Sequence, residues 1–326
     1  LRDGIRRVNR APAVLLGVFA MTLLVSVPLA VAMRSLLAQH LGNSLIADSA
    51  ASGVDYDWMQ EFADQATGLG VTFKPTIIGF AAVLDNLSAF LDNTSRPVVI
   101  VAAASIYVIG WLFLAGGIID RLARDRATRA HGFFAACGVH FFRFLRLAVV
   151  QWIVYALLFG ALHPWLFERL YPRMIHEVTV ERTAFMIRVA LYLVFGAIVA
   201  AATIVFDYAK IRTVVEDRRS MLAAINAAAG FISRHLAAAV SLFLADFVLF
   251  LAVVALYGLI APGGGGRGIM VWAAFAIGQL YIVARLWVKL VFWASETTLF
   301  QSRLAHAGYV SRAEPAWPDS PAADMM

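Results

Sequence analysis

The sequence predicts an all-α protein: a polytopic bundle of six transmembrane helices, with amphipathic helices at the membrane surfaces. Of its 326 residues, 61% are hydrophobic and 15% are charged, whereas soluble domains are roughly 45–50% apolar and about 25% charged. The apolar residues also come in blocks of about 20, the length that an α-helix needs to cross a bilayer. Composition and pattern together exclude a soluble globular protein.

Six segments are long enough to span a membrane and contain at most one or two ionisable residues each. We expect these spans at residues 12–33, 97–118, 147–166, 185–206, 236–261 and 268–292. The first segment also fits a signal peptide, because four arginines precede an apolar run that ends in Ala30-Val31-Ala32. That run exceeds the roughly 7–15 apolar residues of a signal peptide, which favours a membrane span.

The basic residues predict the orientation, because lysine and arginine resist transfer across the membrane. Of the 27 basic residues, 19 fall at the two ends of the chain and in the connections between spans two and three and between spans four and five. The other 8 fall on the opposite side. This division places both termini in the cytoplasm, as an even number of spans requires.

The predicted outer loop, residues 34–96, is the largest segment outside the membrane. Its acidic residues outnumber its basic ones 7 to 3, and it is too short to form a domain of its own. Apolar residues recur at helical spacing near residues 76–92, with polar residues opposite them. This pattern predicts a helix in the outer interface, although a helix packed against the spans fits it equally well.

Two predicted cytoplasmic connections, residues 119–146 and 207–235, share one pattern. Each follows a span that closes on an aspartate, continues as a basic amphipathic segment and ends in phenylalanine with arginine or histidine. We expect both to form elbow helices against the inner leaflet. Residues 1–310 should form a single transmembrane domain, and the proline-rich residues 311–326 a disordered cytoplasmic tail.

Residues 207–220 have the sequence DYAKIRTVVEDRRS. This segment resembles one in uncharacterised six-span bacterial membrane proteins, which are loosely similar to the membrane region fused to some glycerophosphodiester phosphodiesterases. In hydropathy the similarity covers about residues 97–310. The resemblance implies a multi-pass protein of the bacterial inner membrane. It brings no catalytic residues to this chain, because the chemistry of those fusions belongs to a separate soluble domain.

An intramembrane polar cluster is predicted around Asp246, which lies about 10 residues into the fifth span. A carboxylate at that depth costs about 2.5–3.5 kcal/mol on insertion scales, so it should face protein, pair or stay protonated. The sixth span runs in the opposite direction and carries Arg285 and Gln279 at comparable depths. We therefore expect an Asp246–Arg285 ion pair supported by Gln279. The pair would either relay protons or substrate, or only fix the packing of the two spans.

The sequence predicts no catalytic set, cofactor or metal site. The single cysteine, Cys137, can form neither an intramolecular disulfide nor a cysteine-based zinc site. Asp55, Asp57 and Glu61 could offer oxygen ligands, but the loop lacks the EF-hand pattern and its glycine. We therefore do not expect an enzyme.

The function that we expect is that of a non-catalytic integral membrane subunit or scaffold. Its partners would be membrane lipids and other membrane proteins or copies of itself, and not nucleic acid, because the basic excess reports orientation. Two alternatives remain open. One is a transporter or permease whose path uses Asp246 and Arg285, and the other is an intramembrane enzyme that acts on lipid.

Overall fold

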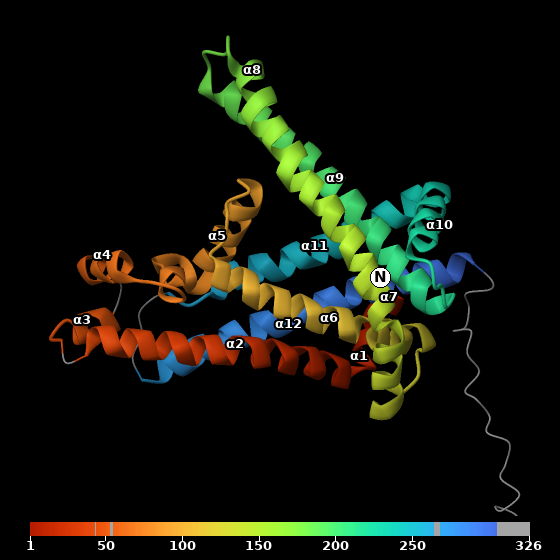
Figure 1. The fold of residues 1–326 in the computed structure, drawn as a ribbon, viewed down its shortest axis with the longest axis horizontal. Helices are drawn as coiled ribbons and strands as arrows, with labels where there is room; N and C mark the ends of the chain where they lie inside the picture. Colours follow the sequence, from red (N-terminus) through yellow and green to blue (C-terminus); the bar gives the residue numbers. More distant parts are fainter. Residues whose placement is uncertain (43, 53–54, 264–267, 305–326) are drawn as a thin grey trace, which may run out of the picture.

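The all-α membrane fold predicted from the sequence is confirmed. A computed structural model describes residues 1–42, 44–52, 55–263 and 268–304. Within these residues every regular element is a helix (Figure 1). Six helical segments are long and apolar enough to cross a membrane, and each overlaps one predicted span. They are α2 (Pro12–Leu41), α6 (Val98–Arg124), the segment Ala130–Ile175, α9 (Glu181–Val215), α11 (Leu236–Ile260) and α12 (Ile269–Arg303).

The third spanning segment changes its helical pattern along its length. It begins as α7 (Ala130–Leu157), continues through two π-helical stretches, η3 (Leu158–Leu162) and η4 (Trp165–Leu170), and ends as α8 (Tyr171–Ile175). Pro164 lies between the two π-helical stretches. Because proline lacks a backbone N–H, it removes one helical hydrogen bond there, which fits the local change of pattern.

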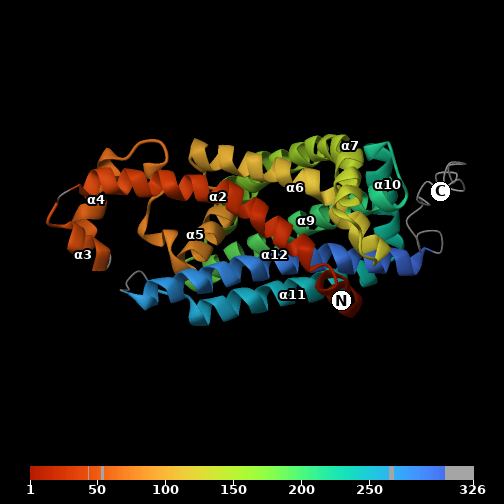
Figure 2. The same ribbon diagram turned by 90° about the horizontal axis from the view of Figure 1, so that it is seen from below.

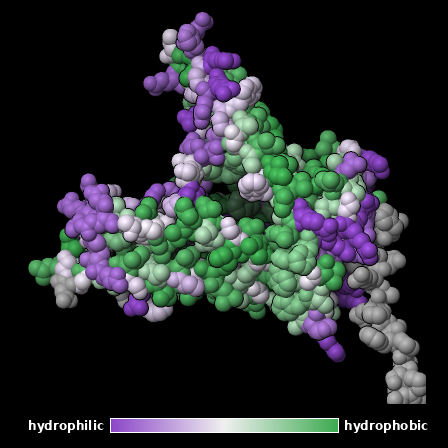
Figure 3. Space-filling view, in the orientation of Figure 1, coloured by the Kyte–Doolittle hydropathy of each residue, from purple (hydrophilic) through white to green (hydrophobic). Residues whose placement is uncertain are grey.

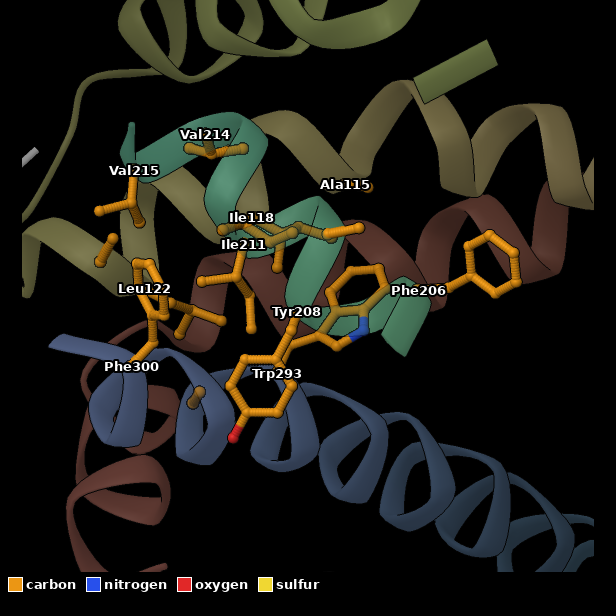
Figure 4. Packing of buried hydrophobic residues seen from close by; sticks show 14 of the residues in the cluster. Ala115, Ile118, Leu122, Phe206, Tyr208, Ile211, Val214, Val215, Trp293 and Phe300 are labelled. Carbon is orange, nitrogen blue, oxygen red and sulfur yellow. The ribbon is translucent and has the colours of Figure 1, made fainter. Parts of the chain in front are cut away.

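Three spans, α6, α9 and α12, run past their predicted ends at the same end of the bundle. Together they bury the largest part of the hydrophobic core, and we call this the core end. Figure 4 shows Ile118 and Leu122 of α6 close to Ile211 of α9 and to Trp293 and Phe300 of α12. The core end is the one that the charge distribution predicts to be cytoplasmic.

The molecule divides into two arms that meet at the core end (Figure 1). One arm contains α2, α6, α11 and α12. The other contains α7 and α9, which diverge from the first arm and have an apolar cluster of their own around Leu166, Leu191 and Phe195. The arms therefore share one core at the core end and separate away from it.

An N-terminal helix, α1 (Arg2–Asn9), packs against α12 at the core end (Figure 2). Gly4 permits this approach, because a Cβ atom there would overlap the Ser295 hydroxyl. Arg7 Nη1 donates hydrogen bonds to the carbonyl of Leu122 at 2.8 Å and to Gln301 Oε1 at 2.7 Å. This helix was not among the predicted elements, and it closes one side of the core.

The two connections that the sequence predicts to be cytoplasmic differ from each other. The second contains a separate helix, α10 (Met221–Arg234), whose N-cap Ser220 accepts a hydrogen bond from the Ala223 amide. The first contains no separate helix where an elbow over 119–146 was predicted. There α6 ends at Arg124, Asp125 adopts a left-handed conformation, and α7 begins at Ala130 and continues into the third span.

The loop between α2 and α6 contains several short helices. A helix was predicted near residues 76–92, and α5 covers most of that range. The Asp55 side chain caps the N-terminus of α4 by accepting a hydrogen bond from the Trp58 amide at 3.0 Å. The predicted tail, residues 311–326, lies outside the described residues. The helices of the loop are α3 (Ala47–Ser52), α4 (Tyr56–Gln65), η1 (Gly70–Thr72), η2 (Pro75–Ile77) and α5 (Gly79–Leu91).

Candidate functional site

The structure does not bring Asp246, Arg285 and Gln279 together. Asp246 is completely buried, and its Oδ1 accepts a 3.4 Å hydrogen bond from the Ser295 hydroxyl. Its Oδ2 has no hydrogen-bond partner in the described part of the chain, and neither has Gln279 Oε1. Arg285 instead lies over the ring of Tyr281, 5.6 Å from its centroid. The predicted Asp246–Arg285 ion pair does not form.

The register between α11 and α12 explains this difference. Ser295, which faces Asp246, follows Arg285 by ten residues, or roughly 15 Å along a helix. The prediction placed the inner end of the sixth span at residue 292, whereas α12 continues to Arg303. The longer helix is shifted along α11, so a different residue stands opposite the carboxylate.

A cavity of about 760 Å³ lies between the spans, bordered by α2, α6, α7, α9, α11 and α12. We call it the central cavity. Figure 3 shows the molecule hollowed between the α7–α9 arm and the other spans, with hydrophobic residues around the hollow. The polar side chains that line the cavity come from five helices. They are Thr22, Tyr107, Gln151, Thr203, Asp207, Lys210, Arg285 and Lys289.

Three of these residues, Lys210, Arg285 and Lys289, form what we call the cationic cluster. Lys210 Nζ pairs with Asp207 Oδ1 at 2.9 Å. Neither Arg285 nor Lys289 has a carboxylate oxygen within 4 Å in residues 1–42, 44–52, 55–263 and 268–304, and Asp207 is the only carboxylate among the lining residues. The central cavity is therefore positively charged.

Two tryptophans hold the cationic cluster in place. Lys289 Nζ lies 3.7 Å from the ring centroid of Trp111, a distance that permits a cation–π interaction. Trp111 packs edge-on against Trp293 with their centroids 5.5 Å apart. Trp293 Nε1 in turn donates a hydrogen bond to Asp207 Oδ1 at 3.4 Å. The network joins α6, α9 and α12 at one wall of the cavity.

The sequence contained a signal for this site. Arg285, Lys289 and Trp293 are spaced four residues apart, which places them along one face of a helix. Arg285 was instead predicted to pair with Asp246, and Lys289 was counted only among the basic residues at the inner end of the sixth span, where such residues are common. Lys210, which lies on another helix, has no signal of this kind.

A second group of polar side chains near the core end has buried oxygen atoms without partners among the described residues. Asp246 and Tyr208 are fully buried, and Glu296 is 2% exposed. Asp246 Oδ2, Tyr208 Oη and both carboxylate oxygens of Glu296 have no hydrogen-bond partner among the residues that the structure describes. An unpaired buried polar group lowers the stability of a fold by about 1–3 kcal/mol. Groups of this kind are therefore explained by a function or by bound water.

The helix α5 bridges the two arms on the side away from the core end. Asp92, which directly follows α5, accepts hydrogen bonds through Oδ1 from Tyr192 Oη at 2.8 Å and from Arg188 Nη2 at 3.2 Å. The carbonyl of Leu91 accepts a third from His163 Nε2 at 2.8 Å. At the other end of α5, a Cβ atom on Gly79 would lie 2.5 Å from the carbonyl oxygen of Pro262. Thus α5 connects α11 to the α7–α9 arm.

Acid is expected to loosen this bridge. The hydrogen bond from Tyr192 is the largest cause of a lowered pKa at Asp92; partial desolvation opposes it, and Ser88 and Arg188 add to it. Because the folded-state pKa lies below the unfolded value of about 3.9, the contact stabilises the fold above that pH and is lost as the pH falls through the lowered pKa. The effect on the free energy of unfolding should stay under about 1 kcal/mol, because the side chains of Asp92 and Arg188 are both about half exposed.

Hydrogen exchange of the α5 amides measures this effect. At pH 7 the Tyr192→Phe variant should exchange faster in α5 than the wild type, and the exposed Tyr56→Phe should serve as an unaffected control. After correction for intrinsic rates, the two proteins should converge as the pH falls through the lowered pKa of Asp92, which lies below the unfolded value of about 3.9. Equal protection of α5 in wild type and Tyr192→Phe at pH 7 would contradict the role of this hydrogen bond.

The central cavity thus offers positive charge beside aromatic rings. Among the described residues, no group of three or more His, Cys, Asp or Glu side chains is placed to hold a metal ion. No protein-family model, curated protein or solved structure matches this chain. A functional assignment therefore depends on the geometry and chemistry of the cavity itself.

Proposed function

We propose that this protein is a non-catalytic integral membrane component whose central cavity binds an anionic amphipathic molecule, such as a lipid with an acidic headgroup. The observation that carries the proposal is the position of Arg285 and Lys289 in the cavity with no carboxylate oxygen of the described residues within 4 Å of either side chain. Isolated charges inside a membrane cost several kcal/mol and are retained where they pair or serve a function. A bound anion would supply the missing negative charge.

The aromatic part of the cavity lining suits an apolar chain. Phe243, Phe247 and Phe250 lie along one face of α11, and Phe292 of α12 packs edge-on against Phe243. The volume of about 760 Å³ falls within the roughly 300–1,000 Å³ of typical ligand pockets. Positive charge and aromatic rings in one cavity match a molecule with an acidic head and a hydrocarbon tail.

The proposal includes the location and the partners expected from the sequence. The protein would lie in a bacterial inner membrane with both termini in the cytoplasm, which the excess of basic residues on that side supports. Large apolar side chains are exposed along every span, including Leu24, Trp152 and Leu193. These surfaces would contact lipid, other membrane subunits or further copies of the protein.

A transporter of the same anionic ligand is the second candidate. It is favoured by Asp246 and Glu296, two buried carboxyl groups on α11 and α12 that form no ion pair with any residue that the structure describes. Such groups can exchange a proton when a charged ligand enters or leaves. The path would use the cationic cluster, in place of the Asp246–Arg285 pair that the structure does not form.

Ligand binding to the purified protein tests the proposal. Dodecyl phosphate and dodecylphosphocholine, titrated calorimetrically against protein in a neutral detergent, share a chain length and differ in net charge. We expect the wild type to favour dodecyl phosphate about tenfold or more, because each charge-assisted hydrogen bond contributes about 1.5–3 kcal/mol. The double variant Arg285→Gln/Lys289→Gln should lose that preference and bind dodecyl phosphate about 10–100-fold more weakly.

A matched control removes two exposed arginines outside the cavity, in the double variant Arg219→Gln/Arg303→Gln. It lowers the net charge equally and should bind as the wild type does. Equal affinity of the wild type for both amphiphiles, or equal losses in both double variants, would refute the proposed site. If binding holds, uptake of dodecyl phosphate into proteoliposomes distinguishes a transporter from a component that only binds.

A further inference from the structure

A second cavity, of about 550 Å³, lies between α2, α6 and the beginning of α7. It shares no lining residue with the central cavity. Along α2 it extends from Arg10 and Ala11 to Leu24, roughly 20 Å of helix. It therefore reaches from the core end toward the middle of the spans, a depth comparable to one leaflet of the bilayer. We call it the α2–α6 groove.

The end of the groove at the core end is positively charged. Arg121 is only 6% exposed, and its Nη2 donates a hydrogen bond to the carbonyl of Arg10 at 3.1 Å. Its Nη1 is buried and has no hydrogen-bond partner within the described residues. Arg10 lines the same end, with its side chain 59% exposed and 3.6 Å from Asp125, a residue that is not part of the lining. Arg121 lines the groove, and one nitrogen of its guanidinium group has no partner among the described residues, so a small movement of this side chain would present that nitrogen to an acceptor in the groove.

The remainder of the groove is apolar and open. A Cβ atom added to Gly17 would have no neighbouring heavy atom within 4 Å, so this part of α2 faces empty space. Leu24 and Met21 of α2 lie on one side of the groove, and Phe113 of α6 and Phe134 of α7 on the other. A hydrocarbon chain placed here would cover apolar surface that the protein leaves uncovered.

We propose that the α2–α6 groove is a binding site for an anionic phospholipid. Its phosphate would accept hydrogen bonds from Arg121 Nη1 and from Arg10, and one acyl chain would lie past Gly17. Arginine suits phosphate because its N–H groups are planar and permanently charged. The headgroup would satisfy the unpaired guanidinium nitrogen, which otherwise costs free energy in a buried position. This site does not depend on the function proposed for the central cavity.

Native mass spectrometry of the detergent-extracted protein tests this site. The Arg285→Gln/Lys289→Gln background removes binding at the central cavity, and phosphatidylglycerol is compared with phosphatidylcholine. We expect one phosphatidylglycerol to bind in preference to phosphatidylcholine. Gly17→Phe, which fills the apolar part of the groove, and Arg121→Gln, which removes the phosphate donor, should each weaken its binding about tenfold.

The control is Gly278→Phe. Gly278 lies in α12, also has no heavy atom within 4 Å of an added Cβ, and lies outside the groove. This variant should retain the lipid as its parent does. Equal occupancy by the two lipids, or unchanged phosphatidylglycerol binding in Gly17→Phe, would overturn the proposal. The Gly17→Phe result is decisive even if Arg121→Gln fails to fold, because it leaves every charged group in place.

Discussion

Replacing Gly116 or Gly117 by leucine is expected to drive α6 apart from α7 and to prevent assembly of the folded protein. A Cβ atom at Gly116 would lie 2.8 Å from His140 Cβ and 2.9 Å from the carbonyl oxygen of Ala136. At Gly117 it would lie 2.8 Å from the carbonyl oxygen of Phe133. Backbone atoms cannot move aside as a flexible side chain can, so the helices themselves must shift.

The smaller substitutions Gly116→Ala and Gly117→Ala should have a weaker effect of the same kind. Each should lower the free energy of unfolding by about 1–3 kcal/mol, the usual cost of overpacking a tight core. Small residues commonly permit this close approach between membrane helices. Size-exclusion elution and the thermal midpoint in detergent measure both effects. Leucine at Gly132 or Gly138 of α7, where an added Cβ meets nothing within 4 Å, is the control. A Gly117→Leu protein with a wild-type midpoint would show that the predicted helix contact is wrong.

Asp207→Ala is expected to lower the free energy of unfolding by about 3–5 kcal/mol, the range measured when one partner of a buried ion pair is removed. The carboxylate is the common acceptor for Lys210 Nζ at 2.9 Å and Trp293 Nε1 at 3.4 Å. Without it, Lys210, Arg285 and Lys289 would line one cavity with no carboxylate among the lining residues. The loss thus combines an unpaired buried charge with repulsion between cations.

A double-mutant cycle isolates this interaction. Adding Lys210→Met to Asp207→Ala should restore much of the lost stability, because the unpaired cation is then gone. Asp3→Ala is the control, since Asp3 pairs with Arg6 at the surface with both side chains more than half exposed. It should cost less than about 1 kcal/mol. Equal thermal midpoints for Asp207→Ala and Asp3→Ala would rule out a stabilising role for the buried pair.

The polar site was only partly predictable. Arg285 was selected from the sequence because it lies within an apolar segment, and it does line a cavity. The partner predicted for Arg285 was wrong, because α12 continues to Arg303 and the C-terminal half of α12 is buried in the core. Lys289 lies near the predicted end of the sixth span at residue 292, and Glu296 lies beyond it. Hydropathy shows where a helix leaves the apolar region, but not how far it continues inside a protein core.

The helix α1 illustrates the same limit at the start of the chain. Residues 2–9 contain three arginines and one aspartate, a composition that indicates a charged flank before a span. In the structure they form a helix that packs on α12, with Gly4 against Ser295 and Arg7 bonded to Leu122 and Gln301. The two hydrogen bonds of Arg7 reach residues 115 and 294 positions away, which no local pattern encodes.

The sequence by itself determined the fold class and the six spans, because the cost of exposing polar groups to lipid acts on each segment separately. The tertiary structure alone decided which charged residues share a cavity. That outcome depends on the register of α12 against α11 and on the helices packed around the C-terminal half of α12. A shift of a few residues along a helix changes every side chain that it presents to a neighbour, so Asp246 faces Ser295 while Arg285 and Lys289 face the central cavity.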